Sequence, residues 1–476
     1  MKVLFASSEV FPFSKTGGLG DMANFLPKSL NNIGVEVTVI SPYYRSVIPY
    51  HKQMTYVGSK ELYIGDYHTI VNYYRYILDN TEFIFIQNQQ SFERDHFYGY
   101  DDDDLRFITF SYAVLEYVDL MKEIPQLIHV NDWQSAPIPF LLDVHYRYKE
   151  KYQFIHTLLS IHNLNYQGNF SKFSAKYFNM DFNYTYMHFG DVNYLKTGIL
   201  KATKINTVSP QYRNEILTED FGFTLDGSLR ERKRDLVGIL NGIDFDVFNS
   251  ETDQLIVKNF SSRNLKVGKK TNKEAILNYF GIEDGNLDAP VISYIGRLVS
   301  QKGIHLMEQT LEDLVYHSNA YLVVLGSGDQ YFQNYFNYLK NKYPDRVLFY
   351  EGYNEKLAHQ IYAGSDIFLM PSMFEPCGLG QMIAMRYGTI PLVRETGGLK
   401  NTVEPYNKYD NTGTGFSFYD PDPYVFKEKI FEAIDLYNNS PNKWGQLMRR
   451  AMKTDFSLEN MAKQYLKLYQ EIVGGK

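Results

Sequence analysis

Short apolar runs alternate with amphipathic stretches of helical length along most of this chain, in two successive series. This alternation is typical of parallel strands joined by crossover helices. The first series predicts strands over residues 2–7, 35–41, 83–87, 127–131, 155–161 and 204–208. The second predicts strands over 291–295, 321–326, 346–350, 366–370 and 390–394. We therefore expect an α/β protein with two separate sheets.

Residues 244–290 lie between the two series and contain clusters of Asp, Asn, Ser, Lys and Gly, which favour loops. We place a hinge and the start of a second domain there. Each half opens with an apolar strand, a glycine-containing loop and a helical stretch, which predicts a doubly wound, Rossmann-like domain. Ligands of such sheets bind beyond the carboxyl ends of the strands, so the expected active site is a cleft between two facing domains.

Composition narrows the class of protein further. The 476 residues suffice for two large domains, and a net charge of −7 argues against a nucleic-acid partner. Cys377 is the only cysteine, which rules out a disulfide within the chain and predicts a reducing compartment. Glu9 interrupts the N-terminal apolar run, which is too short for a signal peptide, and no apolar stretch is long enough to span a bilayer. We expect a cytoplasmic protein with no membrane partner.

The segment Lys15–Asp21, Lys-Thr-Gly-Gly-Leu-Gly-Asp, lies between the first predicted strand and a predicted helix. Glycines let backbone N–H groups approach an anion, and the start of a helix adds positive potential. Lys15 beside Gly17 and Gly18 therefore suggests a phosphate ester as ligand, and Asp21 is placed to accept hydroxyls of the group that carries it. A plain surface turn is the alternative. Neither of the common nucleotide-binding glycine motifs is present.

The second half contains a stronger set of candidates. Arg297 ends one predicted strand and Lys302 follows shortly, so both cations could converge on a diphosphate. Glu375 follows the strand at 366–370, and Pro376 and Gly378 force a turn that presents its carboxylate with the backbone amides of 377–380. The alternatives are a solvated basic loop, and a helix-capping Glu375 beside a small buried Cys377.

Polar residues also end two strands of the first half. Asp132 and Trp133 follow the strand at 127–131, and His162 and Asn163 follow the strand at 155–161. These side chains are expected at the ligand-binding edge, where His162 is able to hydrogen-bond a sugar hydroxyl, although a purely structural histidine is the alternative. The spacings typical of zinc hydrolases and serine hydrolases are absent from the sequence.

Taken together, these motifs resemble those of bacterial glycogen synthases and plant starch synthases, nearly end to end and in the family's order. The matching segments are Lys15–Asp21, His162–Gly168, Asn241–Asp244, Gly296–Gly303, Glu375–Leu379 and Thr396–Leu399. The resemblance implies the GT-B fold, in which two Rossmann-like domains face each other across the active site. It places the N-terminal domain at 1–243, the nucleotide-sugar domain at 244–456, and a last helix at 457–476 that returns to the first domain.

The resemblance also implies a reaction. Glucose would pass from ADP-glucose to the non-reducing 4-hydroxyl of an α-1,4-glucan, either glycogen or a maltooligosaccharide, with retention at the anomeric carbon and with no cofactor or metal. The catalytic candidates by resemblance are Lys15, His162, Arg297, Lys302 and Glu375. The further substrate-binding candidates are Gly17, Gly18, Asp21, Asp132, Trp133, Asn163, Asn241, Tyr353, Cys377, Gly378 and Leu379.

Roles within this set follow the family. Residues matching Arg297, Lys302 and Lys15 face the diphosphate, and the one matching Tyr353 stacks on adenine. Those matching His162, Asn163, Asn241, Glu375, Cys377 and Gly378 surround the glucose, and those matching Asp132 and Trp133 lie near the acceptor and the donor sugar.

Three departures from the family and two rival functions remain. Gln134 stands where many members have histidine, four aspartates at 101–104 replace a segment that usually contains glycine, and Gly380 stands where some members have threonine. These departures leave the acceptor preference open. The rivals are another GT-B nucleotide-sugar transferase, such as a sucrose-forming enzyme, and a non-catalytic glucan-binding homologue. A binding protein has no reason to keep cations directed at a leaving diphosphate, so the charged set favours an enzyme.

Overall fold

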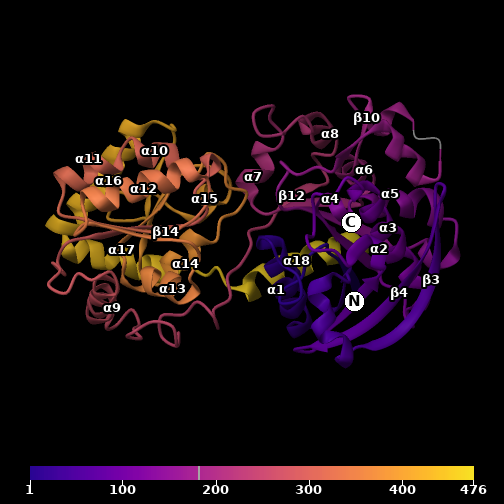
Figure 1. Ribbon diagram of the computed structural model, residues 1–476, viewed down its shortest axis with the longest axis horizontal. Helices are drawn as coiled ribbons and strands as arrows, with labels where there is room; N and C mark the ends of the chain where they lie inside the picture. The colour runs from indigo at the N-terminus through magenta and orange to yellow at the C-terminus, as the bar shows by residue number, and fades with distance from the viewer. Residues whose placement is uncertain (181–182, 476) are drawn as a thin grey trace. The chain divides into compact units, whose positions relative to one another are not determined.

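The computed structural model describes residues 1–180 and 183–475, and the chain divides into two compact units (Figure 1). Unit 1 comprises Met1–Leu240 together with Leu458–Lys476, and unit 2 comprises Asn241–Ser457. The division expected at 243/244 lies beside the observed one. Within the described residues, no helix combines the length and the apolar character needed to cross a membrane.

Unit 1 is built on a sheet with strand order β12-β11-β7-β6-β1-β2-β5-β4-β3. Its strands are β1 Lys2–Ala6, β2 Glu36–Pro42, β3 Thr55–Ile64, β4 Tyr67–Leu78, β5 Thr81–Gln87, β6 Leu127–Asn131, β7 His156–Ile161, β11 Lys204–Thr207 and β12 Leu236–Gly238. A small sheet contains β8 Asn169–Phe170, β9 Met187–His188 and β10 Asp191–Asn193. The helices are α1 Gly18–Asn32, α2 Gln89–Phe92, α3 Asp103–Tyr117, α4 Asp132–Ser135, α5 Pro137–Leu141, α6 Tyr194–Lys201, α7 Pro210–Glu215, α8 Asp226–Glu231 and α18 Leu458–Val473.

The sheet of unit 1 is mixed, whereas the sequence predicts parallel strands throughout. β3, β4 and β5 pair antiparallel, and the other neighbours pair parallel. The sequence pattern did not predict β3 and β4, because polar and charged residues alternate with apolar ones along these strands. Such alternation is what an edge hairpin with one face in solvent requires. The two-residue Gly65-Asp66 turn that joins them is the signal that predicts such a hairpin.

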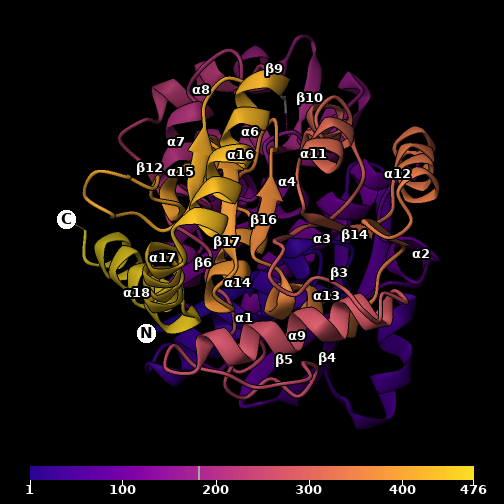
Figure 2. The same cartoon turned by 90° about the vertical axis from the view of Figure 1, so that its left-hand side faces the viewer.

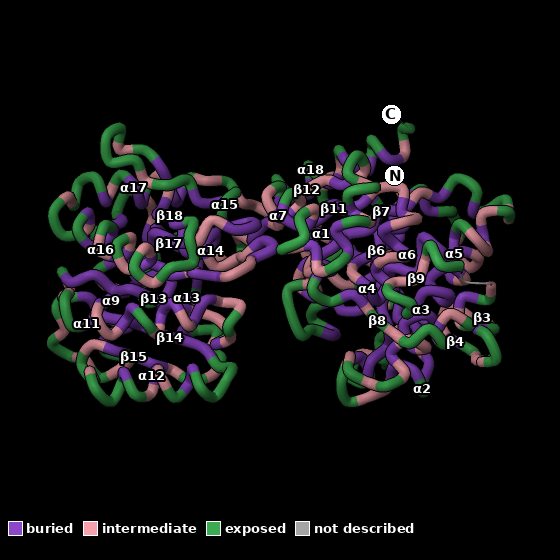
Figure 3. Tube along the Cα trace, turned by 90° about the horizontal axis from the view of Figure 1, so that it is seen from above, coloured by how far each residue is buried: buried purple, intermediate pink, exposed green. Residues whose placement is uncertain are grey.

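Unit 2 contains a parallel sheet in the order β15-β14-β13-β16-β17-β18. Its strands are β13 Val291–Ile295, β14 Tyr321–Gly326, β15 Val347–Glu351, β16 Ile367–Met370, β17 Ile390–Arg394 and β18 Phe416–Phe418. Its helices are α9 Leu265–Tyr279, α10 Ile304–Glu308, α11 Leu311–His317, α12 Gln330–Lys342, α13 Glu355–Gly364, α14 Gly380–Arg386, α15 Gly397–Thr402, α16 Pro423–Asn439 and α17 Pro441–Lys453. In each unit most strands are buried, and exposed residues lie on the outer helices and loops and, in unit 1, on the β3–β4 edge hairpin (Figure 3).

The segment 244–290 is a packed part of unit 2, which corrects the expectation of a hinge along its length. It contains α9, which packs against α13 (Figure 2). Ile276 of α9 lies in the same buried cluster as Val323 of the sheet. Lys273 Nζ, on the same helix, forms a buried ion pair with Asp366 Oδ2 at 2.7 Å. The residues of 244–290 that favour loops therefore lie on either side of α9, a helix that packs into the core of unit 2.

The last helix, α18, begins at Leu458 and packs against α1 within unit 1. Tyr469 Oη lies 2.7 Å from His129 Nδ1, and Asn206 Nδ2 donates to Tyr465 Oη at 2.9 Å. Both tyrosines are fully buried. The C-terminal end of the chain is therefore a structural part of the N-terminal unit.

Candidate active site

Three neighbouring strands bring the sequence motifs of unit 1 to one edge of its sheet. β7, β6 and β1 are adjacent and parallel, so their carboxyl ends lie side by side. The glycine loop follows β1, Asp132 follows β6, and His162 follows β7. This adjacency of parallel strands places the polar residues that follow them at one edge of the sheet, as the sequence predicts.

The glycine loop leads directly into α1, which begins at Gly18 with Gly17 as its N-cap. A Cβ atom added at either glycine would meet nothing within 4 Å, so packing within the unit does not require them. Open space beside the first turn of a helix is what a bound anion needs. Lys15 Nζ lies at this turn and contacts Asp21 Oδ1 at 2.8 Å, so Asp21 is paired with a cation in this structure.

Glu9 organises the glycine loop, a role that the sequence motifs do not predict. Its carboxylate, in a residue only 3% exposed, accepts hydrogen bonds from Thr16 N at 2.5 Å, Thr16 Oγ1 at 2.6 Å, Gly17 N at 3.4 Å and Tyr98 Oη at 2.8 Å. The backbone amides of Thr16 and Gly17 therefore donate to Glu9. That the rest of the loop faces a phosphate stays a prediction. A carboxylate buried between an apolar strand and a glycine loop needs hydrogen-bond donors. The position of Glu9 between these two segments is therefore the sequence feature that could have predicted its role.

Asp132 and His162 form the centre of the unit 1 edge. Asp132 Oδ1 accepts the backbone N–H of His162 at 2.7 Å, and His162 Nε2 lies 2.9 Å from Asn131 Oδ1. Asp132 has a φ of 53°, in the left-handed region that non-glycine residues rarely adopt. Burial raises the pKa of the Asp132 carboxyl group to about 7 and lowers the pKa of His162 to about 4. His162 is therefore neutral at neutral pH and interacts by hydrogen bonds.

Trp133 and its neighbours pack inside unit 1. The Trp133 ring lies 4.9 Å from Phe107 and 5.6 Å from Phe170, measured between ring centroids, and 9% of the residue is exposed. Gly168 has a φ of +64°, and a Cβ there would lie 2.5 Å from the indole. Among the described residues, none forms a hydrogen bond with the buried Gln134 Oε1. Trp133 thus packs in the interior of unit 1 next to Asp132, and Gln134 Oε1 remains available as a hydrogen-bond acceptor.

Replacing Asp132 with asparagine should change how stability depends on pH. The folded-state pKa of about 7 lies above the ordinary 3.8, so the unfolded chain ionises first as the pH rises. The unfolding free energy of the wild type relative to Asp132→Asn should therefore fall between about pH 4 and pH 7, by roughly 2 kcal/mol or less from pH 5 to pH 7.

The measurement is urea unfolding followed by Trp133 fluorescence in a Trp444→Phe background, because each unit contains one of the two tryptophans. A difference that stays flat across this pH range would show that Asp132 is ionised in the folded protein.

The unit 2 candidates lie at the carboxyl edge of its own sheet. Arg297 follows β13, Tyr353 follows β15, Glu375 follows β16, and the glycines at 397 and 398 follow β17. Tyr353 is 80% exposed, as a stacking platform for a ring must be. Arg297 is also exposed, with its Nη2 atom 3.4 Å from Gln301 Oε1.

Lys302 and Glu375 form the central ion pair of unit 2. Lys302 Nζ donates to Glu375 Oε2 at 2.7 Å, and Ser372 Oγ donates to the same oxygen at 2.9 Å. Glu375 is 7% exposed, so its charge depends on these partners. The pair joins a cation able to contact a phosphate to a carboxylate able to accept sugar hydroxyls. The exposed guanidinium of Arg297 hydrogen-bonds Gln301, the residue before Lys302.

Cys377 lies two residues after Glu375, and the backbone N–H of Asn241 faces its thiol. Burial raises the pKa of that thiol to about 12. Cys377 therefore stays protonated and is no nucleophile. Among the described residues, none donates a hydrogen bond to the buried Asn241 Oδ1. That oxygen is available to a hydroxyl of a bound ligand.

Glycines hold the Glu375 turn in place. Gly378, just before Leu379 caps α14, has a φ of +73°, and Gly397 has a φ of +45°. A Cβ atom at Gly397 would collide with the carbonyl oxygen of Glu375, and one at Gly398 with that of Cys377. The glycine pair after β17 therefore supports the Glu375 turn by close backbone packing.

Gly397→Ala should destabilise unit 2 by about 3 kcal/mol or more, because it adds a backbone collision to an unfavourable φ. The matched control is Gly445→Ala on α17, where only Arg449 lies nearby and alanine should stabilise the helix by up to about 1 kcal/mol. The measurement is urea unfolding followed by Trp444 fluorescence in a Trp133→Phe background. Equal stability of the two variants would show that the turn does not depend on Gly397.

The candidates thus form one set within each unit. The first contains Lys15, Gly17, Gly18, Asp21, Asp132, Trp133, His162 and Asn163. The second contains Asn241, Arg297, Lys302, Tyr353, Glu375, Cys377, Gly378 and Leu379. That both sets contact one ligand stays a prediction. Across residues 1–180 and 183–475, no three His, Cys, Asp or Glu side chains gather as metal ligands would.

Family comparisons assign the two units to glycosyltransferases. Residues 2–231 match the family described as "Starch synthase catalytic domain", and residues 278–450 match "Glycosyl transferases group 1". The chain is 56% identical to a glycogen synthase of Acholeplasma laidlawii, with all of both chains covered. It is 42% identical to a glycogen synthase of Streptococcus sanguinis, covering 99% of this chain and all of the relative.

Solved structures give the same result. The catalytic domain of starch synthase IV from Arabidopsis thaliana, solved with ADP and acarbose bound, has a TM-score of 0.87 and 32% identity over 99% of each chain. A sucrose-phosphate synthase from Thermosynechococcus elongatus has a TM-score of 0.62 at 17% identity over the full length of both chains, a likeness that shows the fold alone.

Proposed function

This chain belongs to the glycogen synthase family of GT-B glycosyltransferases, and we propose that it transfers glucose from ADP-glucose to the non-reducing 4-hydroxyl of an α-1,4-glucan with retention. The observation that carries the proposal is the Lys302–Glu375 ion pair beside the exposed Arg297. Two cations suit a leaving diphosphate, and a carboxylate with Asn241 Oδ1 suits the hydroxyls of glucose.

In this proposal the protein stabilises charge that develops during the reaction. As the bond between the sugar and the diphosphate breaks, the sugar becomes oxocarbenium-like and the diphosphate gains negative charge. Arg297, Lys302 and the first turn of α1 with Lys15 stabilise the diphosphate, and the carboxylate of Glu375 faces the sugar. Neutral His162 hydrogen-bonds a glucose hydroxyl while Asn131 holds its ring.

Retention follows when the acceptor attacks from the side that the diphosphate leaves. The 4-oxygen of the glucan forms the new bond to the anomeric carbon, and its proton passes to the departing phosphate oxygen. This route needs no second carboxylate as nucleophile. It requires the strand edges of both units to face one donor, and closure around that donor would exclude water from the oxocarbenium-like centre.

The nucleotide preference should depend on Tyr353. The ADP in the Arabidopsis relative and the exposed Tyr353 ring support a purine donor, since a purine offers more stacking area than uracil. We expect kcat/KM for ADP-glucose to exceed that for UDP-glucose by at least about 10-fold, and Tyr353→Ala to narrow the ratio by roughly 2–10-fold.

The measurement is release of the nucleoside diphosphate with glycogen as acceptor, and it also tests the proposed function itself. Tyr316→Ala, which changes another exposed tyrosine of unit 2, is the control and should leave the ratio unchanged. Equal kcat/KM for the two donors would refute the preference. Glycogen binding without any release of nucleotide would favour the non-catalytic homologue. A cytoplasmic location and independence from metals stay predictions from the sequence.

A further inference from the structure

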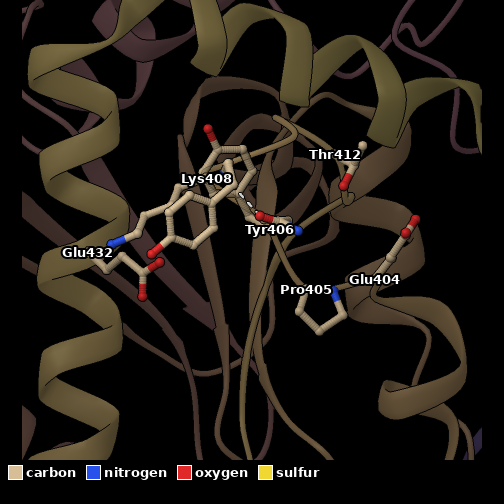
Figure 4. A pocket seen from close by; sticks show the side chains of 8 residues that line it. Glu404, Pro405, Tyr406, Lys408, Thr412 and Glu432 are labelled. Carbon is tan, nitrogen blue, oxygen red and sulfur yellow. Dashed lines mark hydrogen bonds between the residues drawn. The ribbon is translucent and has the colours of Figure 1, made fainter.

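Unit 2 has a pocket of about 600 Å³ that is separate from the candidate active site (Figure 4). It is lined by residues 404–409 and Thr412, which lie between α15 and β18, and by Glu432 of α16. β18 runs parallel to β17, so the loop that leads into β18 lies toward the amino-terminal edge of the sheet. Arg297 and Glu375 follow their strands and lie at the carboxyl edge.

The loop of this pocket is held in one shape by its own hydrogen bonds. Tyr406 N donates to Gly415 O at 2.7 Å, and Asn407 N donates to Thr412 O at 3.1 Å. Tyr409 N donates to the side-chain Oδ1 of Asn407 at 2.9 Å. A site that is already formed loses little conformational entropy when a ligand binds.

The lining has the chemistry of a sugar site. Tyr409 is 86% exposed with Lys408 Nζ 5.4 Å from its ring centroid, and Glu404 is also exposed. Figure 4 shows Glu404 on the side of the pocket opposite Glu432. With Lys408 as the one cation of this lining and two carboxylates present, a phosphate or nucleotide is disfavoured. Aromatic faces with carboxylate and amide groups match the apolar face and the hydroxyl rim of glucose.

We propose that this pocket, the glucan anchor (residues 404–409, Thr412 and Glu432), binds a chain of the α-1,4-glucan acceptor outside the active site. The identity of the ligand rests on the proposed function. Glycogen carries many chains on one particle, so a chain held at the anchor keeps other chain ends at a high effective concentration near the active site. A short oligosaccharide occupies one site at a time and gains nothing from the anchor.

The test compares a large acceptor with a short one. Tyr409→Ala should raise the KM for glycogen roughly 2–10-fold, the loss expected for one aromatic contact, with kcat and the KM for maltotriose unchanged. Tyr316→Ala, which removes a tyrosine 73% exposed on α11, is the matched control and should change none of these values. Retardation in native gels that contain glycogen gives a second readout without turnover, and Tyr409→Ala should be retarded less than the wild type.

Each remaining outcome overturns the anchor. An unchanged KM for glycogen with unchanged retardation would show that the pocket does not bind glucan. A parallel rise in both KM values, or a fall in kcat, would show a general structural effect. If the wild type transfers no glucose to either acceptor, the proposed function fails, but the native gels still test the anchor. Equal retardation of the wild type and Tyr409→Ala, or no retardation of either protein, contradicts the anchor.

Discussion

Lys302→Ala is expected to lower kcat by roughly 10²–10³, the scale for losing one preorganised donor to developing charge. The ammonium group lies at the carboxyl edge of the unit 2 sheet and is fixed by its 2.7 Å contact with Glu375. Its loss removes a charge partner from the leaving diphosphate and leaves a buried carboxylate without its cation. The same order of loss is expected for Arg297→Ala.

The measurement is the steady-state release of ADP with glycogen as acceptor, after Trp444 fluorescence has shown that unit 2 is folded. Lys340→Ala, on the exposed side of α12, is the matched control and should retain wild-type turnover. Turnover near that of the wild type in Lys302→Ala would remove this residue from the mechanism.

Glu375→Gln is the second large effect, with kcat expected to fall by roughly 10²-fold. Glutamine keeps the shape of the side chain but loses the negative charge that faces the sugar. The Kd for ADP should change by less than about 10-fold, because the sugar end of the donor is absent from ADP. Kinetics with glycogen and calorimetric titration with ADP separate the two effects. Glu308→Gln, which alters a carboxylate of unit 2 that bonds Tyr331, is the control.

The double variant Lys302→Ala/Glu375→Gln tests whether the pair works as one unit. Its loss in kcat should be smaller than the product of the two single losses, since either substitution already breaks the ion pair. An effect of Glu375→Gln confined to ADP binding would move Glu375 to the nucleotide end of the donor.

The positions of the site residues could be predicted because parallel strands fix where their ends lie. Arg297 and Glu375 follow buried apolar strands, β13 and β16, and the apolar runs locate those strands to within one or two residues. The same reasoning places Asp132 and His162 at one edge of unit 1, where the structure joins them by a hydrogen bond.

The sequence pattern did not reveal which partner each polar group takes. Lys15 binds Asp21, Lys302 binds Glu375, and Glu9 holds the glycine loop, all through contacts that depend on side-chain positions in three dimensions. The antiparallel β3 and β4 hairpin was missed because its solvated face breaks the apolar runs by which the other strands are recognised.

The claim that this protein transfers glucose from ADP-glucose to a glucan with retention is tested most directly with ADP-glucose that carries ¹³C at the anomeric carbon and with maltotetraose as the acceptor. The new linkage is identified by NMR. The account predicts stoichiometric ADP and a product lengthened at its non-reducing end by an α-1,4-linked glucose. A β-linked product, or labelled glucose released to water with no lengthened chain, would contradict it.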